Sequence, residues 1–167
     1  MDLTPYLGWI VFLHVIGVFV FAAGHGVSIA VSFRIRSERD PSRLLAYLDL
    51  SAWSLNLAGI GLLILLVFGI LAGIVAQDFG RLWLWVSIVL FVVIGGLMTP
   101  LAGIPLAKVR VALGQRTRGM KPTDPDPVPL PIAEVVPMLG VLRPELLALI
   151  GGGGFLVILY LMMFKPF

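Results

Sequence analysis

Residues 6–33 read YLGWIVFLHVIGVFVFAAGHGVSIAVSF, an apolar run that contains no Asp, Glu, Lys or Arg. A helix needs about 20 predominantly apolar residues to cross the hydrocarbon core of a bilayer. The run therefore predicts a transmembrane helix, and it is too long for the apolar core of a cleaved signal peptide. The whole chain agrees with this prediction, because 59% of its 167 residues are hydrophobic and its mean hydropathy is +1.06.

Three further segments are long and apolar enough to span a membrane: 46–76, 82–106 and 144–164. Within lipid a backbone must satisfy its own hydrogen bonds, so each segment is expected to be helical. The prediction is an all-α fold, a bundle of four transmembrane helices that forms a single integral membrane domain over residues 1–167. Gly69 and Gly73 form a GxxxG pair in the second segment, and we expect it to serve packing inside the bundle rather than homodimerisation.

The basic residues are distributed unevenly between the two ends of this predicted bundle. Ten of the twelve lie after the first segment, in RIRSERDPSR, or between the third and fourth segments, whereas Arg81 and Lys165 belong to the other end. Since loops rich in Lys and Arg stay in the cytoplasm, both termini are expected outside a bacterial inner membrane. This topology also accounts for the net charge of +3, so nucleic-acid binding is not expected.

The connection between the third and fourth segments is rich in proline. Residues 121–137 read KPTDPDPVPLPIAEVVP, with six prolines. Proline fixes φ and removes a backbone donor, so the segment predicts a stiff, extended cytoplasmic strap. Two interpretations stay open: the strap is a spacer between helices, or it is a docking strip for a partner protein.

The only two histidines, His14 and His25, both lie in the first predicted helix. At 1.5 Å and 100° per residue they share nearly one face and lie about 16.5 Å apart along the axis. Gly17, Phe21 and Gly24 share that face. Ionisable side chains avoid lipid, so the face is expected to point into the bundle.

Counting residues along each helix places small or polar side chains at the level of His25, about 12 Å inside the basic end. They are Gly24, Gly26, Asn56, Gly59, Gly95, Gly96, Thr99 and residues 151–154. Glycines at one depth predict either close helix contact or a slot for a flat ligand. In the first interpretation His25 bonds Asn56, Thr99 or a backbone carbonyl; in the second, neutral imidazoles ligate a metal macrocycle such as haem b or another tetrapyrrole. A second axial ligand would then be Met98, Met138 or a histidine of a second copy, unless the position stays open.

The pattern HxxxxxxFxAG, at His14, Phe21, Ala23 and Gly24, resembles the first helix of small four-helix bacterial membrane proteins. These include copper-resistance-D-type membrane domains, an uncharacterised integral membrane family of similar length, and the small b-haem membrane protoporphyrinogen oxidase. In the oxidase the corresponding histidine is taken as a haem ligand, so the resemblance implies this role for His14. The oxidase also uses a lysine inside a later helix, and this chain has none before Lys108; the resemblance therefore implies haem rather than that reaction.

The sequence thus predicts a b-haem-binding subunit with an electron-transfer or redox-accessory role in a membrane complex. Its expected metal ligands are His14 and His25, with Phe21, Gly24 and Met98 beside the cofactor. The alternative is a structural or interaction subunit without a cofactor, within a larger assembly or a homo-oligomer. No nucleophile with its base, phosphate-binding loop or carboxylate pair stands out, so whether the protein is an enzyme stays open.

Overall fold

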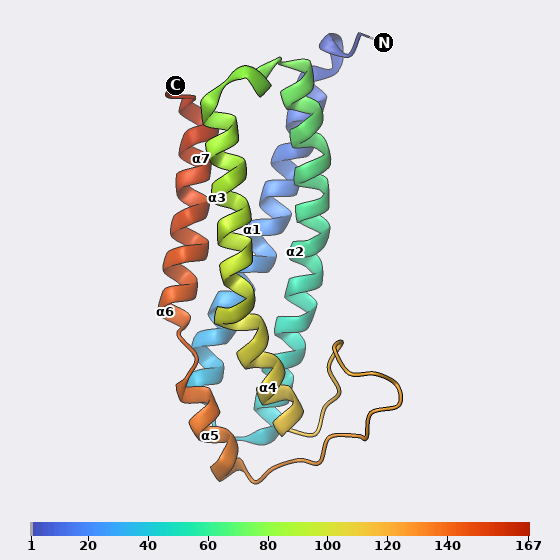
Figure 1. The fold of residues 1–167 in the computed structure, drawn as a ribbon, viewed down its shortest axis with the longest axis vertical. Coiled ribbons are helices and arrows are strands. Elements are labelled where there is room, and N and C mark those ends of the chain that lie inside the picture. The colour runs from blue at the N-terminus through green and yellow to red at the C-terminus, as the bar shows by residue number, and fades with distance from the viewer. Residues whose placement is uncertain (1) are drawn as a thin grey trace.

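The computed structural model describes residues 2–167, and within that range it contains helices and connecting segments but no strand. Four of its helical rods are long and apolar enough to cross a membrane, which confirms the predicted all-α four-helix bundle. Figure 1 shows the rods side by side, with the two termini at the same end of the bundle. The opposite end carries the arginine-rich loop and the proline-rich strap, and we call it the basic end.

The first two rods are α1, Leu7–Ser37, which follows a short 3₁₀ turn at Thr4–Tyr6, and α2, Pro41–Val75. Both extend beyond the predicted segments at the basic end, where α2 begins at Pro41 rather than residue 46. The side chain of Asp40 caps α2 by accepting hydrogen bonds from the backbone N–H groups of Ser42 and Arg43. An N-cap acid followed by proline is a strong helix start, and it outweighs the polar composition that hydropathy alone would place outside the helix.

The other two rods each contain a π-helical stretch. The third consists of α3, Leu82–Met98, a π-helical segment at Thr99–Gly103, and α4, Ile104–Ala112. The fourth consists of α6, Pro144–Leu147, a π-helical segment at Ala148–Gly153, and α7, Gly154–Phe164. Proline inside the third rod and the glycine run inside the fourth weaken the regular hydrogen-bond ladder, which allows the wider π-helical turns.

The strap prediction is wrong for the last part of residues 121–137. Helix α5 covers Ile132–Gly140 and includes Pro137, whereas residues 121–131 form turns and irregular chain. Val135 and Leu139 lie one helical turn apart and are fully buried, so burial of an amphipathic face outweighs the proline. From here the strap means residues 121–131.

The largest cluster of buried apolar residues lies at the basic end, where it joins elements from both halves of the chain. Its members include Val31 and Ile35 of α1, Leu44 and Leu48 of α2, Leu106 and Val109 of α4, Val135 and Leu139 of α5, and Leu142. Ion pairs surround this core, among them Arg36 with Glu145 and Arg110 with Asp49. The basic end is therefore a helical region with its own hydrophobic core.

Between the two ends, the rods pack as two pairs, α1 with α2 and α3 with α7. Glycines bring the first pair into backbone contact: a Cβ on Gly24 would lie 2.6 Å from backbone atoms of Ser54 and Ala58. Phe21 of α1 bridges to the second pair, with ring centroids 6.4 Å from Phe91 and 6.1 Å from Phe155. The α1–α2 pair thus contacts the α3–α7 pair through aromatic side chains, whereas α1 and α2 contact each other directly through their backbones.

The terminal end is closed by a cluster around a buried carboxylate. Asp78, in the 3₁₀ turn Asp78–Gly80, pairs with Nζ of Lys165 at 2.9 Å and with Nε of Arg81 at 3.1 Å. The Lys165 ammonium also lies 5.0 Å from the centroid of the Trp83 ring. This cluster joins the α2–α3 connection to the residue that follows α7.

Candidate functional site

His14 is held against α2 by a hydrogen bond to the main chain. Its Nδ1 lies 2.8 Å from the carbonyl oxygen of Leu65, and since a carbonyl can only accept, Nδ1 carries the proton. Gly69 leaves the room for the ring, because a Cβ there would lie 2.9 Å from Nδ1 and Cε1. With the proton on Nδ1, the lone pair of a neutral imidazole is on Nε2, and this atom has no hydrogen-bond partner among residues 2–167.

His25 has a different environment and faces the fourth rod. Its ring stacks on Phe21, with centroids 5.7 Å apart and planes 5° from parallel. Its Nε2 is buried without a hydrogen-bond partner in the described chain, and it lies directly against Gly151 of the π-helical segment. The imidazole itself fills the gap left by this glycine. No room remains along Nε2 for an iron atom, so His25 does not fit an axial ligand.

The two histidines predicted as metal ligands have separate environments. His14 faces Gly69 of α2 and His25 faces Gly151, so the two imidazoles serve different contacts. The backbone of α2 closes the space beside Gly24, and the ring of Phe21 is engaged with other aromatic rings. The spaces beside Gly17 and Gly24, the two glycines that share this face with Phe21, are therefore filled by the protein.

The predicted layer at the level of His25 is also not a slot. Asn56 is exposed, and its Oδ1 accepts a hydrogen bond of 2.8 Å from Nη2 of Arg118. A guanidinium is costly deep in hydrocarbon, so Asn56 lies near the membrane boundary. Four glycines of the layer face outward with open space around them: Gly26, Gly59, Gly95 and Gly96. The depth of a residue along its helix could be counted from the sequence. Whether that residue faces the bundle interior or the outside could not be derived in the same way.

Neither methionine expected as a second ligand is held against a histidine by a hydrogen bond within the described chain. Met98 ends α3 and is half-buried, and within the described chain it makes no hydrogen bond to either histidine. Met138 of α5 lines a cavity at the basic end. Across residues 2–167, no group of three His, Cys, Asp or Glu side chains could hold a metal ion. His14 is thus the one predicted ligand whose ring nitrogen is both oriented and free.

Arg116 and Arg118 fix the chain around the strap. Nη1 of Arg116 donates to Oδ1 of Asp126 at 2.7 Å and to the main-chain oxygen of Asp124 at 2.9 Å. The carboxylate of Asp124 in turn accepts from the backbone N–H of Lys121 at 2.7 Å. Arg118, which is bound to Asn56, holds the chain just before the strap against α2, and in Figure 1 the strap then swings out from the bundle and returns beneath it to α5.

No family model matches the chain, and neither a curated protein nor a solved structure matches it. The resemblance of α1 to haem-binding membrane proteins stays a prediction. Function is therefore argued from the contacts described above.

Proposed function

We propose that the protein is a small multi-pass subunit of a bacterial inner-membrane redox complex, and that it binds b-type haem through Nε2 of His14. The hydrogen bond from Nδ1 of His14 to Leu65 carries the proposal. Histidines that ligate metals almost always donate their other ring N–H to a carbonyl, a carboxylate or water, which orients the ring and raises its basicity. His14 has this arrangement, whereas the backbone at Gly151 blocks His25.

The position of His14 suggests how a macrocycle would be covered. The ring is half-buried, and the cavities lined by Lys108 and by Arg36 lie at the basic end rather than beside it. A haem on His14 would therefore lie on the surface of the α1–α2 pair, and a second chain would cover it and supply the other axial ligand. Val11, three residues before His14 and on the same side of α1, is exposed and available for such a contact. Haem bound there would supply one-electron transfer within the membrane.

The test is an absorption spectrum of the full chain, produced with haem supplied and purified in detergent. We expect a reduced-minus-oxidised spectrum with a b-type α band. The band should be lost in His14→Gly, restored by added imidazole, and retained in the matched variant His25→Ala. A folded wild-type protein without the band, or a band that His14→Gly leaves unchanged, would refute haem ligation by His14.

We also propose that the basic end lies in the cytoplasm and both termini outside, as the distribution of Lys and Arg indicates. The chain has no cysteine, so single cysteines can report each side. A membrane-impermeant maleimide should label Gly80→Cys in cells with a permeabilised outer membrane and an intact inner membrane, and Val128→Cys only after the inner membrane is opened. The reverse labelling would overturn this orientation.

The fixed strap favours a second candidate function, that of an interaction subunit without a cofactor. Arg116 holds the strap in place while Val128 at its surface remains 78% exposed. In this case, deletion of residues 123–131 should release co-purifying membrane proteins, whereas Lys121→Met should not. If the protein migrates alone with or without these residues, the docking role is excluded. The haem spectrum is a separate measurement, so the two candidates can fail independently.

A further inference from the structure

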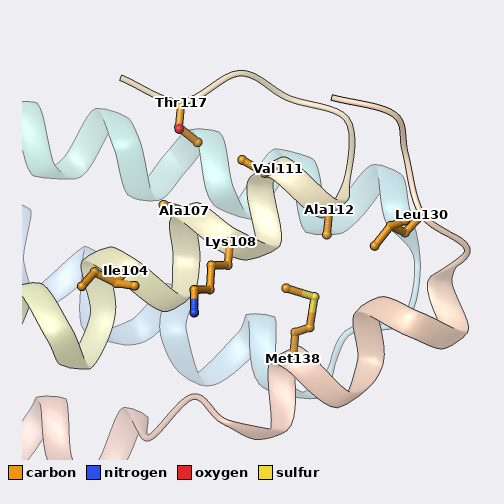
Figure 2. A pocket seen from close by; sticks show the side chains of 8 residues that line it. All are labelled: Ile104, Ala107, Lys108, Val111, Ala112, Thr117, Leu130 and Met138. Atoms are coloured by element: carbon orange, nitrogen blue, oxygen red, sulfur yellow. The ribbon is translucent and has the colours of Figure 1, made fainter. Parts of the chain in front are cut away.

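A cavity of about 500 Å³ opens at the basic end between α4, α5 and the strap (Figure 2). Its walls are mostly apolar, with Ile104, Ala107 and Val111 on α4, Met138 on α5 and Leu130 at the end of the strap. The polar residues that line it are Lys108 and Thr117. The volume falls within the usual range for small-molecule sites, about 300–1,000 Å³.

Lys108 is the cation of this cavity, and its ammonium is unpaired within residues 2–167. Other basic residues of the same end are engaged, such as Arg36 with Glu145, Arg110 with Asp49, and Arg116 with Asp126. Figure 2 shows the Lys108 side chain extending from α4 toward the side on which Met138 lies. An apolar cavity with one unpaired ammonium suits an amphiphile that has an acidic head.

The cavity lies where the bilayer would supply such a molecule. Helix α4 is the last part of the membrane-spanning rod Leu82–Ala112. Ile104, at the beginning of α4, is 50% exposed, so an apolar side chain leads from the spanning rod to the cavity. Arg118, which binds Asn56 on the neighbouring helix, marks the depth at which charged groups begin. Lipid headgroups occupy this boundary.

We propose that the cavity binds an anionic phospholipid, with its phosphate at Nζ of Lys108 and an acyl chain against Ile104, Ala107 and Val111. Basic pockets between transmembrane helices bind acidic lipid headgroups in this manner. A zwitterionic lipid carries its own cation beside the phosphate, so it gains less from Lys108. Free phosphate has no chain to bury on the apolar walls.

The experiment is native mass spectrometry of the full chain in detergent, titrated with phosphatidylglycerol or phosphatidylcholine that carry identical acyl chains. Phosphatidylglycerol should bind more tightly, and Lys108→Met should weaken it about fivefold, as expected for one lysine at a membrane surface. Lys108→Arg should retain binding, as should the matched variant Lys121→Met on the strap. Ala107→Phe, which fills the cavity and keeps the ammonium, should weaken both lipids.

Three results would overturn the proposal. The first is equal binding of the two lipids. The second is unchanged phosphatidylglycerol binding in both Lys108→Met and Ala107→Phe, with each variant shown by circular dichroism to be folded. The third is displacement of the lipid by millimolar inorganic phosphate, which would identify a site for free anions. None of these measurements depends on haem, so the lipid site is tested separately from the role of His14.

Discussion

The imidazole of His25 occupies the space that a side chain at Gly151 would need, because a Cβ at residue 151 would overlap Nε2 of the histidine. The ring cannot simply turn away, since Phe21 stacks on its face at 5.7 Å. This contact joins α1 to the π-helical segment of the fourth rod. The two residues therefore act as one packing unit.

Gly151→Ala should lower the free energy of unfolding by about 1–3 kcal/mol, the usual cost of overpacking a tight contact. The measurement is unfolding by SDS in mixed micelles, followed by circular dichroism. The second substitution His25→Ala should recover most of the loss, because it removes the overlapping ring. In the matched variant Gly152→Ala, nothing lies within 4 Å of the new Cβ, and stability should change by less than about 1 kcal/mol. Equal losses in the two alanine variants would contradict the role given to His25.

Gly24→Ala tests the close contact between α1 and α2. The added methyl group would lie 2.6 Å from the carbonyl oxygen of Ser54 and from the backbone nitrogen of Ala58, which cannot move without separating the helices. We expect a loss of about 1–3 kcal/mol in the same unfolding assay. Gly26→Ala is the control on the same helix, since open space surrounds Gly26. If both variants are as stable as the wild type, the two backbones are not in contact here.

Lys165→Met tests the ion-pair cluster at the terminal end. The Asp78 side chain is only 9% exposed, and the substitution leaves Arg81 as its remaining partner. Because the Lys165 side chain is 43% exposed, solvent screens the pair, and we expect a loss of about 1 kcal/mol. Lys121→Met should stay within about 0.5 kcal/mol of the wild type. A double-mutant cycle with Asp78→Asn should give a coupling of the same size as the single loss; zero coupling would show that the pair contributes nothing.

Glu38, between α1 and α2, makes stability depend on pH at the acidic end of the range. Its carboxylate accepts hydrogen bonds from the backbone N–H groups of Arg39 at 2.8 Å and Asp40 at 3.1 Å, which lower its pKa below the ordinary value. A lowered pKa contributes stability above the unfolded-state pKa, and this contribution is lost as the pH falls through the folded-state pKa. Unfolding measured from pH 7 down to pH 3 should therefore be less dependent on pH in Glu38→Gln than in the wild type. Identical slopes in the two proteins would refute this role for Glu38.

The number and order of the rods could be predicted from hydropathy, because a membrane requires long apolar segments. The start of α2 at Pro41 was missed although Asp40 and Pro41 together form a recognisable helix start. Helix α5 was missed because prolines were weighed above the apolar spacing of Val135 and Leu139. Capping and periodicity therefore carry information that hydropathy omits.

The candidate site could be predicted only in part. The sequence shows that His14 and His25 carry the only imidazoles, and helix geometry places both on nearly one face of the first helix. That face is expected to point away from lipid because ionisable side chains avoid it. Which glycine each ring would meet could not be derived, because it depends on how the four rods rotate relative to one another. Gly69 and Gly73 both face side chains of the same chain, the His14 ring and the Phe79 ring, rather than another backbone. The lipid cavity was missed altogether, since the strap, α4 and α5 come together only in the folded chain.

The glycine contacts within the first pair use residues from one continuous stretch, since Gly17 and Gly24 meet residues 54–65. The α1–α2 hairpin can therefore complete its interface before α7 has been synthesised. The α3–α7 pair forms later, because the ribosome must synthesise α4, the strap, α5 and α6 before it reaches α7. Biogenesis would thus proceed in two steps, with the core of the basic end and the Asp78–Lys165 pair locking the hairpins together last.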